Sequence, residues 1–419
     1  MSSTPTIAVV GASAAGIAVV ESLHRSGYDG SLTLIGDESR LPYERPPLSK
    51  RVLIGDQSPE STTIRDAGRL EQRPGLDLRL GIRATALDVA DRRLTLETGE
   101  ELDCAAVVIA TGVRPRRIPG AAGTSGVHVL RTVDDATALR KDLLAGGDVV
   151  VVGGGVLGTE VAAAARTLGL RVTLATMDEQ PLAPVLGASV GRMIADEHRR
   201  RGIHVRLRRT VAGLLTAYGR VTGVQLDGGE VIPADVVVVA VGSVPATGWL
   251  AGSGLDLADG VGCDSFCVAA PYVYAAGDVA RWWHPRYERA LRIEHRMNAS
   301  EQGMVVARNI LAKLIGSGTP PEAYEPVPYF WSDQYGWRIQ AYGVTSGSRR
   351  MEVVRAEPSA AADEPPRVVA LYGDEKRVLG AVGIDLRPPA LRSLRAAVAG
   401  LVPWDEGLDA ARAASDGNW

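Results

Sequence analysis

One segment near the start of the chain carries residue types suited to binding a phosphate. In TIAVVGASAAGIAVVESL (6–23), an apolar β-branched run is followed by small residues and then by a helical pattern. A glycine-rich turn lets backbone N–H groups approach a phosphate, and the positive end of the next helix dipole faces the same point. The dinucleotide fingerprint G-x-G-x-x-G falls on Gly11, Ser13 and Gly16, with the next smallest residue in the middle. Asp37, after the next strand, is the acid expected for a ribose.

The pattern returns in the middle of the chain. DVVVVGGGVLGTEVAAAARTLGL (148–170) carries the complete fingerprint at Gly153, Gly155 and Gly158. A repeat with buried strand, glycines and alanine-rich helix in the same order predicts two dinucleotide sites in one chain. Glu160 stands two residues further into the helix, where its carboxylate either bonds to a ligand or simply favours the helix N-terminus.

The strand that follows this second turn ends without the usual acid. Thr176 stands where a ribose-binding carboxylate is expected, and Asp178 comes two residues late. No arginine or lysine follows directly in the sequence to hold a 2′-phosphate. We therefore expect NADH to be favoured over NADPH, with NADPH left as an alternative.

Three further apolar runs stop at turns, as strands do at the C-terminal edge of a parallel sheet, where ligands collect. The last of them, VYAAGD (273–278), ends at Asp278, whose carboxylate can accept a hydrogen bond from a sugar hydroxyl. The other two are AAVVIAT (105–111), followed by Gly112, and the run at 236–241, followed by Gly242.

The loop LPYERPPLSK (41–50) follows the first strand–helix–strand unit. Its three prolines exclude a regular helix or strand and make the loop stiff. Arg45 and Lys50 are cations on this loop, beside a predicted nucleotide fold, and they either meet a ligand or remain two solvated charges.

Length and composition narrow the class of protein. A chain of 419 residues needs two or three domains, and 46% hydrophobic with 23% charged residues is typical of a globular protein. A net charge of −3 gives no reason to expect a nucleic acid or a membrane as partner. The sequence has no uninterrupted apolar run of about 18 residues and no signal-peptide pattern, so we expect a cytoplasmic protein.

The cysteines do not suggest redox or metal chemistry. Cys104, Cys263 and Cys267 are too few for a disulfide framework and lack the C-x-x-C spacing. Further metal ligands do not gather near them, so we expect small packed residues and no metal site.

The last third of the chain changes character twice. RWWHPRYERALRIEHR (281–296) is dense in cations and aromatic residues, and is either a docking surface for an acidic protein or a solvated face with two tryptophans packed beneath it. A helix is expected over 298–314. From about Glu325, alternating strands, a polar loop at 359–366 and a helix over 390–401 predict a small α+β domain.

Together these motifs resemble a known family over essentially the whole chain. The family is that of the FAD-dependent, NADH-using ferredoxin reductases of the putidaredoxin reductase type, which serve cytochromes P450 and aromatic-ring dioxygenases. YERPPLSK (43–50) and the FWSDQY of YFWSDQYG (329–336) are specific to this branch of the two-dinucleotide-binding flavoproteins. The other matching stretches are ATG (110–112), LRTVDDA (130–136), VVGGGVLGTE (151–160), VYAAGDVAR (273–281) and RIEHRMNASEQG (292–303).

The resemblance implies an α/β fold with two Rossmann-like dinucleotide-binding domains, as in glutathione reductase, plus a small C-terminal α+β domain. FAD would bind to a domain built from residues 1–114 and 244–324. NADH would bind to the inserted domain at 115–243, and a C-terminal reductase domain would span 325–419.

Roles for individual residues are also implied by the resemblance. Lys50 would lie beside the isoalloxazine and Glu160 would orient the nicotinamide, which makes these two the candidate catalytic residues. Family members commonly carry a glutamate at the place of Thr176 and an arginine near Val244, and both are missing here. The implied cofactor-binding residues are Gly11, Ser13, Ala14, Ala15, Gly16, Asp37, Arg45, Lys50, Ala84, Ala110, Thr111, Gly112, Arg131, Gly153, Gly155, Val156, Leu157, Gly158, Glu160, Gly242, Gly277, Asp278, Glu294, His295, Arg296 and Trp331.

The implied activity is electron transfer from NADH through FAD to a [2Fe–2S] ferredoxin that serves a cytochrome P450 or a Rieske-type oxygenase. The loop at 41–50 holds no cysteine, which argues against thiol–disulfide, peroxide and coenzyme A disulfide reductases. Two alternatives stay open: an apoptosis-inducing-factor-like interaction protein that binds FAD and NADH, which shares the PPLSK loop, and an NADH oxidase. The expected state is a monomer or a homodimer.

Overall fold

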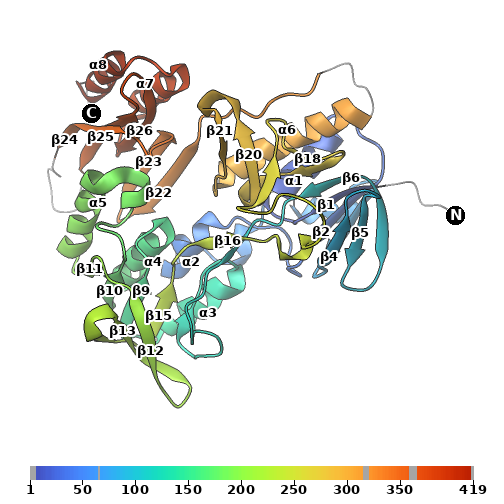
Figure 1. Ribbon diagram of the computed structural model, residues 1–419. Coiled ribbons are helices and arrows are strands. Elements are labelled where there is room, and N and C mark those ends of the chain that lie inside the picture. Colours follow the sequence, from blue (N-terminus) through green and yellow to red (C-terminus); the bar gives the residue numbers. More distant parts are fainter. Residues whose placement is uncertain (1–5, 65–66, 315–319, 358–365, 417–419) are drawn as a thin grey trace. The chain divides into compact units, whose positions relative to one another are not determined.

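The first apolar run forms the centre of a parallel sheet in the computed structural model of the protein (Figure 1). All residues of β1 are buried, and the strand on either side pairs with it in parallel. The β-branched residues of this run suit a strand that is covered on both faces. In spatial order the sheet contains β18 (Val268–Ala270), β19 (Val273–Ala275), β6 (Glu101–Ile109), β1 (Thr6–Val10), β2 (Leu32–Gly36) and β3 (Leu76–Leu80), while β5 (Arg93–Leu96) and β4 (Ala84–Asp88) extend it from β6.

The structure describes residues 6–64, 67–314, 320–357 and 366–416, and the chain divides into two units. Each unit combines segments that are distant in the sequence, so that neither is a continuous stretch of chain. The first unit comprises Met1–Arg45, Glu60–Arg114 and Ser243–Pro326, and the second comprises Pro46–Pro59, Pro115–Gly242 and Val327–Trp419.

Two helices of the first unit, α1 (Ala14–Arg25) and α6 (Arg296–Leu314), share one hydrophobic core. Gly303 permits their close approach, because a Cβ at this position would lie 2.6 Å from the carbonyl oxygen of Ala15. The helix predicted over 298–314 is confirmed, and it begins two residues earlier than expected.

Short strands complete the first unit. The strand predicted over 105–111 is β6, which begins at Glu101 because its first half pairs antiparallel with β5 before its second half enters the parallel sheet. The remaining strands are β7 (Val113–Pro115) with β16 (Ser243–Pro245), and β17 (Val261–Cys263) with β20 (Ala280–His284) and β21 (Arg289–Leu291).

The second glycine turn belongs to a parallel sheet of the second unit. A capping box starts α3 (Val133–Leu144): the hydroxyl of Thr132 accepts from the backbone of Asp135, whose carboxylate accepts from the backbone of Thr132. The sheet contains β11 (His204–Arg206), β10 (Arg171–Ala175), β9 (Asp148–Val152), β15 (Val236–Val239) and β8 (Val127–His128), and the same unit contains α2 (Arg51–Ile54), α4 (Val156–Thr167), α5 (Ala183–Arg200), β12 (Val211–Ala217), β13 (Arg220–Leu226) and β14 (Val231–Pro233).

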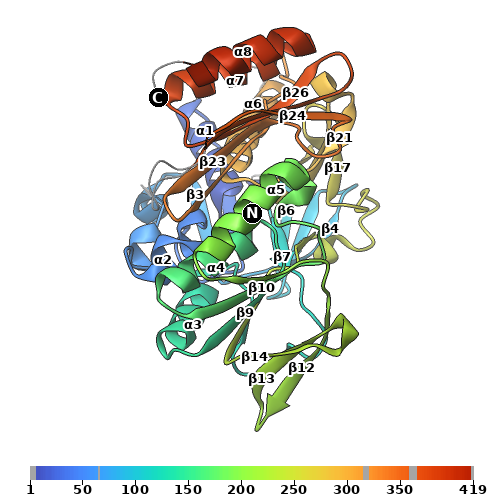
Figure 2. The same cartoon turned by 90° about the vertical axis from the view of Figure 1, so that its left-hand side faces the viewer.

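The C-terminal part of the second unit is an antiparallel sheet with helices on both faces (Figure 2). One face packs against α7 and α8, and the other packs against α5, whose Leu186 and Val190 belong to the same hydrophobic cluster as Tyr372. The elements are β22 (Tyr329–Gln334), β23 (Trp337–Gly343), β26 (Val378–Ile384), β25 (Arg367–Gly373), β24 (Arg350–Glu357), α7 (Pro388–Gly400) and α8 (Trp404–Asp416).

The predicted α+β character of this C-terminal part is confirmed, and two of its elements were not expected. Strand β24 and helix α8 were both missed, because polar and small residues interrupt their apolar pattern. The polar loop expected at 359–366 lies outside the described residues except for its last position.

Within the described ranges, no helix combines the length and the hydropathy needed to cross a bilayer. The predicted fold class is confirmed by the two parallel sheets, each with a glycine turn after its central strand, and by the C-terminal sheet.

Candidate cofactor sites

The first glycine turn is closed by backbone contacts that only glycine permits. Gly11 has a φ of 123°, and a Cβ on it would lie 2.1 Å from the carbonyl oxygen of Ala110. A Cβ on Gly16 would lie 2.0 Å from the carbonyl oxygen of Gly11. Ser13 is the N-cap of α1, yet its hydroxyl makes no capping hydrogen bond. The helix N-terminus and this hydroxyl are therefore left for a phosphate, which fits a dinucleotide such as FAD.

The second turn repeats this construction. Gly153 has a φ of 115°, and a Cβ on it would lie 2.2 Å from the carbonyl oxygen of Ala240. A Cβ on Gly158 would lie 1.9 Å from the carbonyl oxygen of Gly153. Gly155 is the exposed N-cap of α4, and a Cβ there would meet no described atom within 4 Å. This open space at a helix N-terminus fits a second pyrophosphate.

The residues predicted for FAD in the first unit gather at one edge of its sheet. Asp37 directly follows β2 and is exposed, residues 110–112 follow β6, and Asp278 comes shortly after β19. These strands and β1 run in parallel as neighbours, so their ends meet at the edge that carries the first turn. A Cβ on Gly277 would lie 3.0 Å from the Cβ of Ala15, which follows Ala14 in the first turn of α1.

Arg45 and Ala84 also belong to the first unit. Ala84 is the first residue of β4 and is half-buried. The guanidinium of Arg45 pairs with the Glu38 carboxylate at 2.6 Å, and the hydroxyl of Tyr43 donates to the same carboxylate at 2.5 Å. The charge of Arg45 is therefore balanced within the protein, and its contact with FAD stays a prediction.

The segment before α6 is fixed by its own side chains. Arg296 donates two hydrogen bonds to the carboxylate of Glu44, at 2.5 and 2.6 Å, and the hydroxyl of Ser243 donates to Glu294 at 2.6 Å. Burial, and then the charge of Arg296, lower the pKa of His295 to about 4, so its imidazole is neutral near pH 7. A segment fixed in this way can present its backbone to a flat ring.

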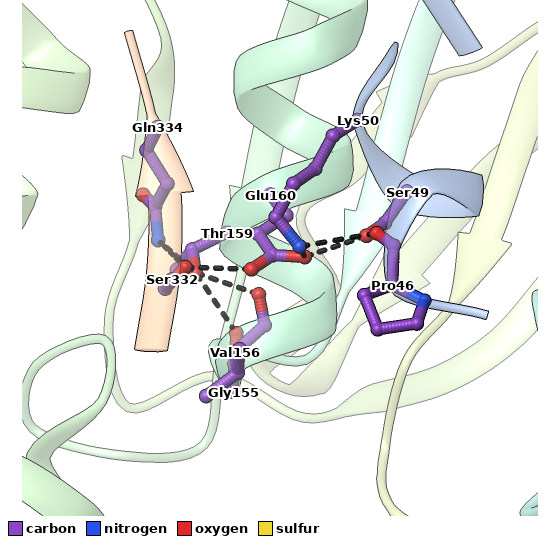
Figure 3. A network of polar contacts seen from close by, with 9 residues as sticks. All are labelled: Pro46, Ser49, Lys50, Gly155, Val156, Thr159, Glu160, Ser332 and Gln334. Carbon is purple, nitrogen blue, oxygen red and sulfur yellow. Dashed lines mark hydrogen bonds and ion pairs between the residues drawn. The ribbon is translucent and has the colours of Figure 1, made fainter. Parts of the chain in front are cut away.

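A buried ion pair joins the proline-rich loop to the second turn in the second unit (Figure 3). The ammonium of Lys50 lies 2.7 Å from Oε2 of Glu160, and the hydroxyl of Ser49 donates to the same oxygen at 2.5 Å. Glu160 is 4% exposed and Lys50 18% exposed at the side chain. The two candidate catalytic residues, predicted from different parts of the sequence, are thus in direct contact.

Local structure explains how Lys50 reaches this position. Pro46–Ser49 forms a short 3₁₀ helix, and α2 begins directly after Lys50. The fixed φ of proline suits the first turn of such a helix, and the lysine ammonium also donates to the carbonyl oxygen of Pro46 at 3.3 Å. The loop at 41–50 was predicted to contain no regular helix or strand, and the structure corrects this with one short 3₁₀ helix, which the prolines permit.

Glu160 has a third partner that the sequence did not reveal as part of the site. The hydroxyl of Ser332, on β22, lies 2.7 Å from Oε1 of Glu160, and the amide of Gln334 donates to Ser332 at 3.0 Å. Both residues belong to the YFWSDQYG motif, and their i, i+2 spacing in a strand predicts a shared face. The sequence does not show which element of the protein this face contacts.

The remaining predicted residues of the second unit lie at sheet edges or helix starts. Val156 and Leu157 form the first turn of α4, and Gly242 follows β15 with a φ of 95°. The backbone N–H of Arg131 donates to the capping carboxylate of Asp135 at 3.0 Å, which fixes the chain before α3. Trp331 on β22 stacks on Tyr329, with ring centroids 5.9 Å apart.

The end of β10 differs from a usual ribose site. Thr176 is 2% exposed, and its hydroxyl bonds to the carboxylate of Asp178 at 3.2 Å. The sequence places no arginine or lysine directly after this strand, but the chain that follows β11 brings the backbone of two arginines to its end: the N–H of Arg208 donates to the carbonyl oxygen of Asp178 and that of Arg209 to the carbonyl oxygen of Thr176. The side chain of Arg208 pairs with Glu179 at 3.5 Å.

The cysteines take no part in these sites. Cys104 and Cys267 are buried as expected, Cys263 is half-buried, and all three belong to the first unit. Burial raises the pKa of both Cys104 and Cys267 to about 12, so neither forms a thiolate near pH 7. The described residues contain no cluster of side chains suited to a metal ion.

The segment at 281–296 is less cationic than its sequence suggests. Arg281 pairs with Asp256, and Arg292 pairs with Asp259 at 3.0 Å. Only one of its two adjacent tryptophans is packed beneath the surface: Trp282 is 0% exposed and Trp283 is 48% exposed.

These features define a class of protein: an oxidoreductase with two dinucleotide sites, a buried lysine–glutamate pair and no cysteine relay. The chain belongs to the pyridine nucleotide-disulphide oxidoreductase family, whose model matches residues 5–303, and a reductase C-terminal model matches residues 329–414. It is therefore an FAD-dependent oxidoreductase that uses NAD(P)H. The predicted resemblance and the two cofactors are confirmed.

Two relatives and one solved structure show the branch of the family. The ferredoxin–NAD(+) reductase component of the anthranilate 1,2-dioxygenase system of Burkholderia cepacia is 36% identical over 409 residues, which is 96% of each chain. Putidaredoxin reductase of Pseudomonas putida is 34% identical over 360 residues, or 84% of this chain and 83% of that protein. The reductase in the covalent putidaredoxin reductase–putidaredoxin complex has a TM-score of 0.87 and 30% identity, covering 99% of this chain and 100% of the other.

Proposed function

We propose that the protein takes a hydride from NADH and passes electrons singly to a [2Fe–2S] ferredoxin that serves a cytochrome P450 or Rieske-type oxygenase. The observation that carries the proposal is the buried Lys50–Glu160 pair beside a complete nucleotide turn, in a sequence without cysteine before Cys104. Without a dithiol there is no relay inside the chain, so electrons leave for an external acceptor. Relatives named as ferredoxin reductase components support a ferredoxin in that role.

The proposal assigns the cofactors to segments of the chain. Residues 1–114 and 244–324 would form the FAD domain, and 115–243 the NADH domain, each around its own glycine turn. Residues 325–419 would form the C-terminal reductase domain, and the resemblance implies that its Trp331 would border the flavin. We also place the reaction in the cytoplasm, on a monomer or a homodimer.

When bound, FAD supplies hydride acceptance from the nicotinamide and release of electrons one at a time. Lys50 holds a fixed positive charge that favours negative charge developing nearby. Glu160 balances this lysine at 2.7 Å, and its own side chain is only 4% exposed. The glycine turns and Glu160 supply orientation, which is the main contribution of a protein to such a transfer.

For the nucleotide, the proposal favours NADH. The carboxylate of Asp178, held by the Thr176 hydroxyl at 3.2 Å, would take the place of the missing glutamate and bond to the ribose. The same charge repels a 2′-phosphate, and Arg208 is already paired with Glu179. NADPH stays the alternative nucleotide.

Two other functions predict different behaviour of the same protein. An apoptosis-inducing-factor-like protein would turn over slowly and would change its association state on reduction by NADH. An NADH oxidase would consume oxygen quickly without any carrier.

The test is a comparison of electron acceptors with the purified holoprotein and NADH. We expect rapid reduction of a [2Fe–2S] ferredoxin, slow oxygen consumption and no reduction of a disulfide substrate. Ferredoxin reduction no faster than oxygen consumption would contradict the proposal and favour the oxidase. Slow turnover with every acceptor, together with NADH-dependent dimerisation, would favour the interaction protein.

A further inference from the structure

Strand β22 directs two side chains of one face toward Glu160 (Figure 3). Ser332 and Gln334 alternate with Trp331 and Asp333, as residues of opposite faces do in a strand. Ser332 is 0% exposed and Gln334 is 4% exposed, so their polar atoms need partners inside the protein. One of these partners is a carboxylate oxygen of Glu160.

The direction of each hydrogen bond in this cluster follows from counting protons. The hydroxyl of Thr159 donates to backbone carbonyl oxygens of its own helix, that of Gly155 at 3.1 Å among them, so it can only accept from the amide of Gln334 at 2.9 Å. The same amide group donates to Ser332 at 3.0 Å. A serine hydroxyl has one proton, and the proton of Ser332 is therefore left for Glu160.

The two oxygens of Glu160 are consequently held from different elements. Oε2 accepts from Lys50 and Ser49, which belong to the proline-rich loop. Oε1 accepts from Ser332, at 2.7 Å, on β22. A carboxylate bonded at both oxygens cannot rotate about its last bond, whereas one bonded only at Oε2 can.

The hairpin that carries Ser332 is itself anchored at the C-terminal end of α5. Tyr335 and Gly336 have φ values of 53° and 84°, as the two central residues of a tight hairpin turn require. The hydroxyl of Tyr335 bonds to Nδ1 of His198, on α5, at 2.9 Å, and the guanidinium of Arg201 lies 5.1 Å from the Tyr335 ring centroid. Burial lowers the pKa of His198 to about 4, so this contact is between neutral groups near pH 7.

From this geometry we propose that Ser332, supported by Gln334, is a positioning residue that sets the orientation of the Glu160 carboxylate for the nicotinamide. The proposal rests on the role given to Glu160 above. It makes β22, in the C-terminal part of the chain, a functional component of the NADH site. Its effect is expected on the nucleotide and not on the retention of FAD, because neither side chain belongs to the first glycine turn.

The test is the variant Ser332→Ala, studied as the FAD-loaded protein. Calorimetry of NAD+ binding to the oxidised protein gives an equilibrium readout, and we expect Kd to rise about fivefold, as for a weakened hydrogen bond to a charged group. The rate of flavin reduction at saturating NADH should fall about tenfold, while reduction by dithionite, which needs no nucleotide site, stays unchanged. FAD content and the melting temperature show whether the variant is folded. A wild-type Kd and rate would overturn the proposal.

Asp333→Asn is the matched control. Asp333 is the next residue in the strand, lies on the opposite face, and pairs with Arg338 at 3.3 Å with 38% of its side chain exposed. We expect wild-type values for this variant. Gln334→Met, which removes the donor to Ser332 but keeps its hydroxyl, should weaken NAD+ binding about twofold, in the same direction as Ser332→Ala. If neither Ser332→Ala nor Gln334→Met weakens NAD+ binding, the proposal is overturned.

Glu160→Gln separates the inference from the proposed function. If this variant binds NAD+ and is reduced by NADH like the wild type, the role of Glu160 itself is wrong. If it is impaired while Ser332→Ala is not, only the role of Ser332 is wrong. In the double variant we expect no loss beyond that of Glu160→Gln, because the serine acts through the glutamate; additive losses would contradict that route.

Discussion

The two glycine turns have the same construction but differ at the positions that face a ligand. In each, the first glycine lies against a carbonyl oxygen of a neighbouring strand end, Ala110 in one and Ala240 in the other. The middle position has no such constraint, because a Cβ on Gly155 would meet no described atom within 4 Å. This explains why Ser13 can stand at the equivalent place in the first turn. Steric contacts fix the turn, and exposed positions remain free to differ.

The residues that directly follow β2 and β10, at the expected ribose positions, differ in the same way. Asp37 is exposed after β2, where a ribose can reach it. Thr176, after β10, is 2% exposed, and its hydroxyl donates a hydrogen bond to the carboxylate of Asp178. The scaffold of both sites could therefore be recognised from spacing, while the proposed preference for NADH rests on Asp178, two residues beyond Thr176.

The largest effect is expected where the turns are most crowded. Gly16→Ala and Gly158→Ala each place a Cβ about 2 Å from a backbone carbonyl oxygen, and we expect each to cost about 3 kcal/mol of stability. Gly16→Ala should abolish FAD retention, and Gly158→Ala should abolish NAD+ binding while FAD stays bound. The flavin-to-protein ratio and NAD+ calorimetry measure the two effects. Loss of FAD in both variants would show that the sites are not separable.

An intermediate effect is expected at the substituted ribose site. Asp178→Asn removes the charge that repels a 2′-phosphate, and we expect the preference for NADH over NADPH to fall about fivefold, as for one partly exposed charge. The ratio of kcat/KM for the two nucleotides measures this. An unchanged ratio would mean that Asp178 does not replace the missing glutamate.

The smallest effect is expected at the unconstrained middle positions. Gly155→Ser and Ser13→Gly exchange the residues of the two turns, and each should change the free energy of unfolding by less than about 0.5 kcal/mol, since no backbone contact is altered. Thermal unfolding of both variants gives the comparison. A large destabilisation in Gly155→Ser would contradict the explanation given for Ser13.

The sequence predicted those features that depend on local pattern. Both turns, the strand expected within 273–278 and the helix expected over 298–314 follow from apolar periodicity and glycine spacing, and the structure forms both elements. The family resemblance predicted a role for Lys50 and a role for Glu160 but not the contact between them, since 110 residues separate the two in the chain.

Contacts set by tertiary packing were not predictable. Ser332 contacts Glu160, which is 172 residues away in the sequence, and the alternation of residues in β22 does not identify this partner. Likewise, Arg208 approaches Asp178 because β11 pairs with β10, which the spacing of charges along the chain does not reveal. Helix α8 was not predicted because small residues occupy many positions of its apolar face, so the helical pattern is weak in the sequence.

The central claim is that the second turn, with Glu160 and Lys50, delivers a hydride from NADH. Anaerobic rapid mixing of the yellow holoprotein with NADH, and separately with NADPH, tests it most directly through the loss of the visible flavin absorbance. The account predicts fast loss with NADH and much slower loss with NADPH. Equally slow loss with both nucleotides would contradict it, because the second turn would then bind no efficient hydride donor.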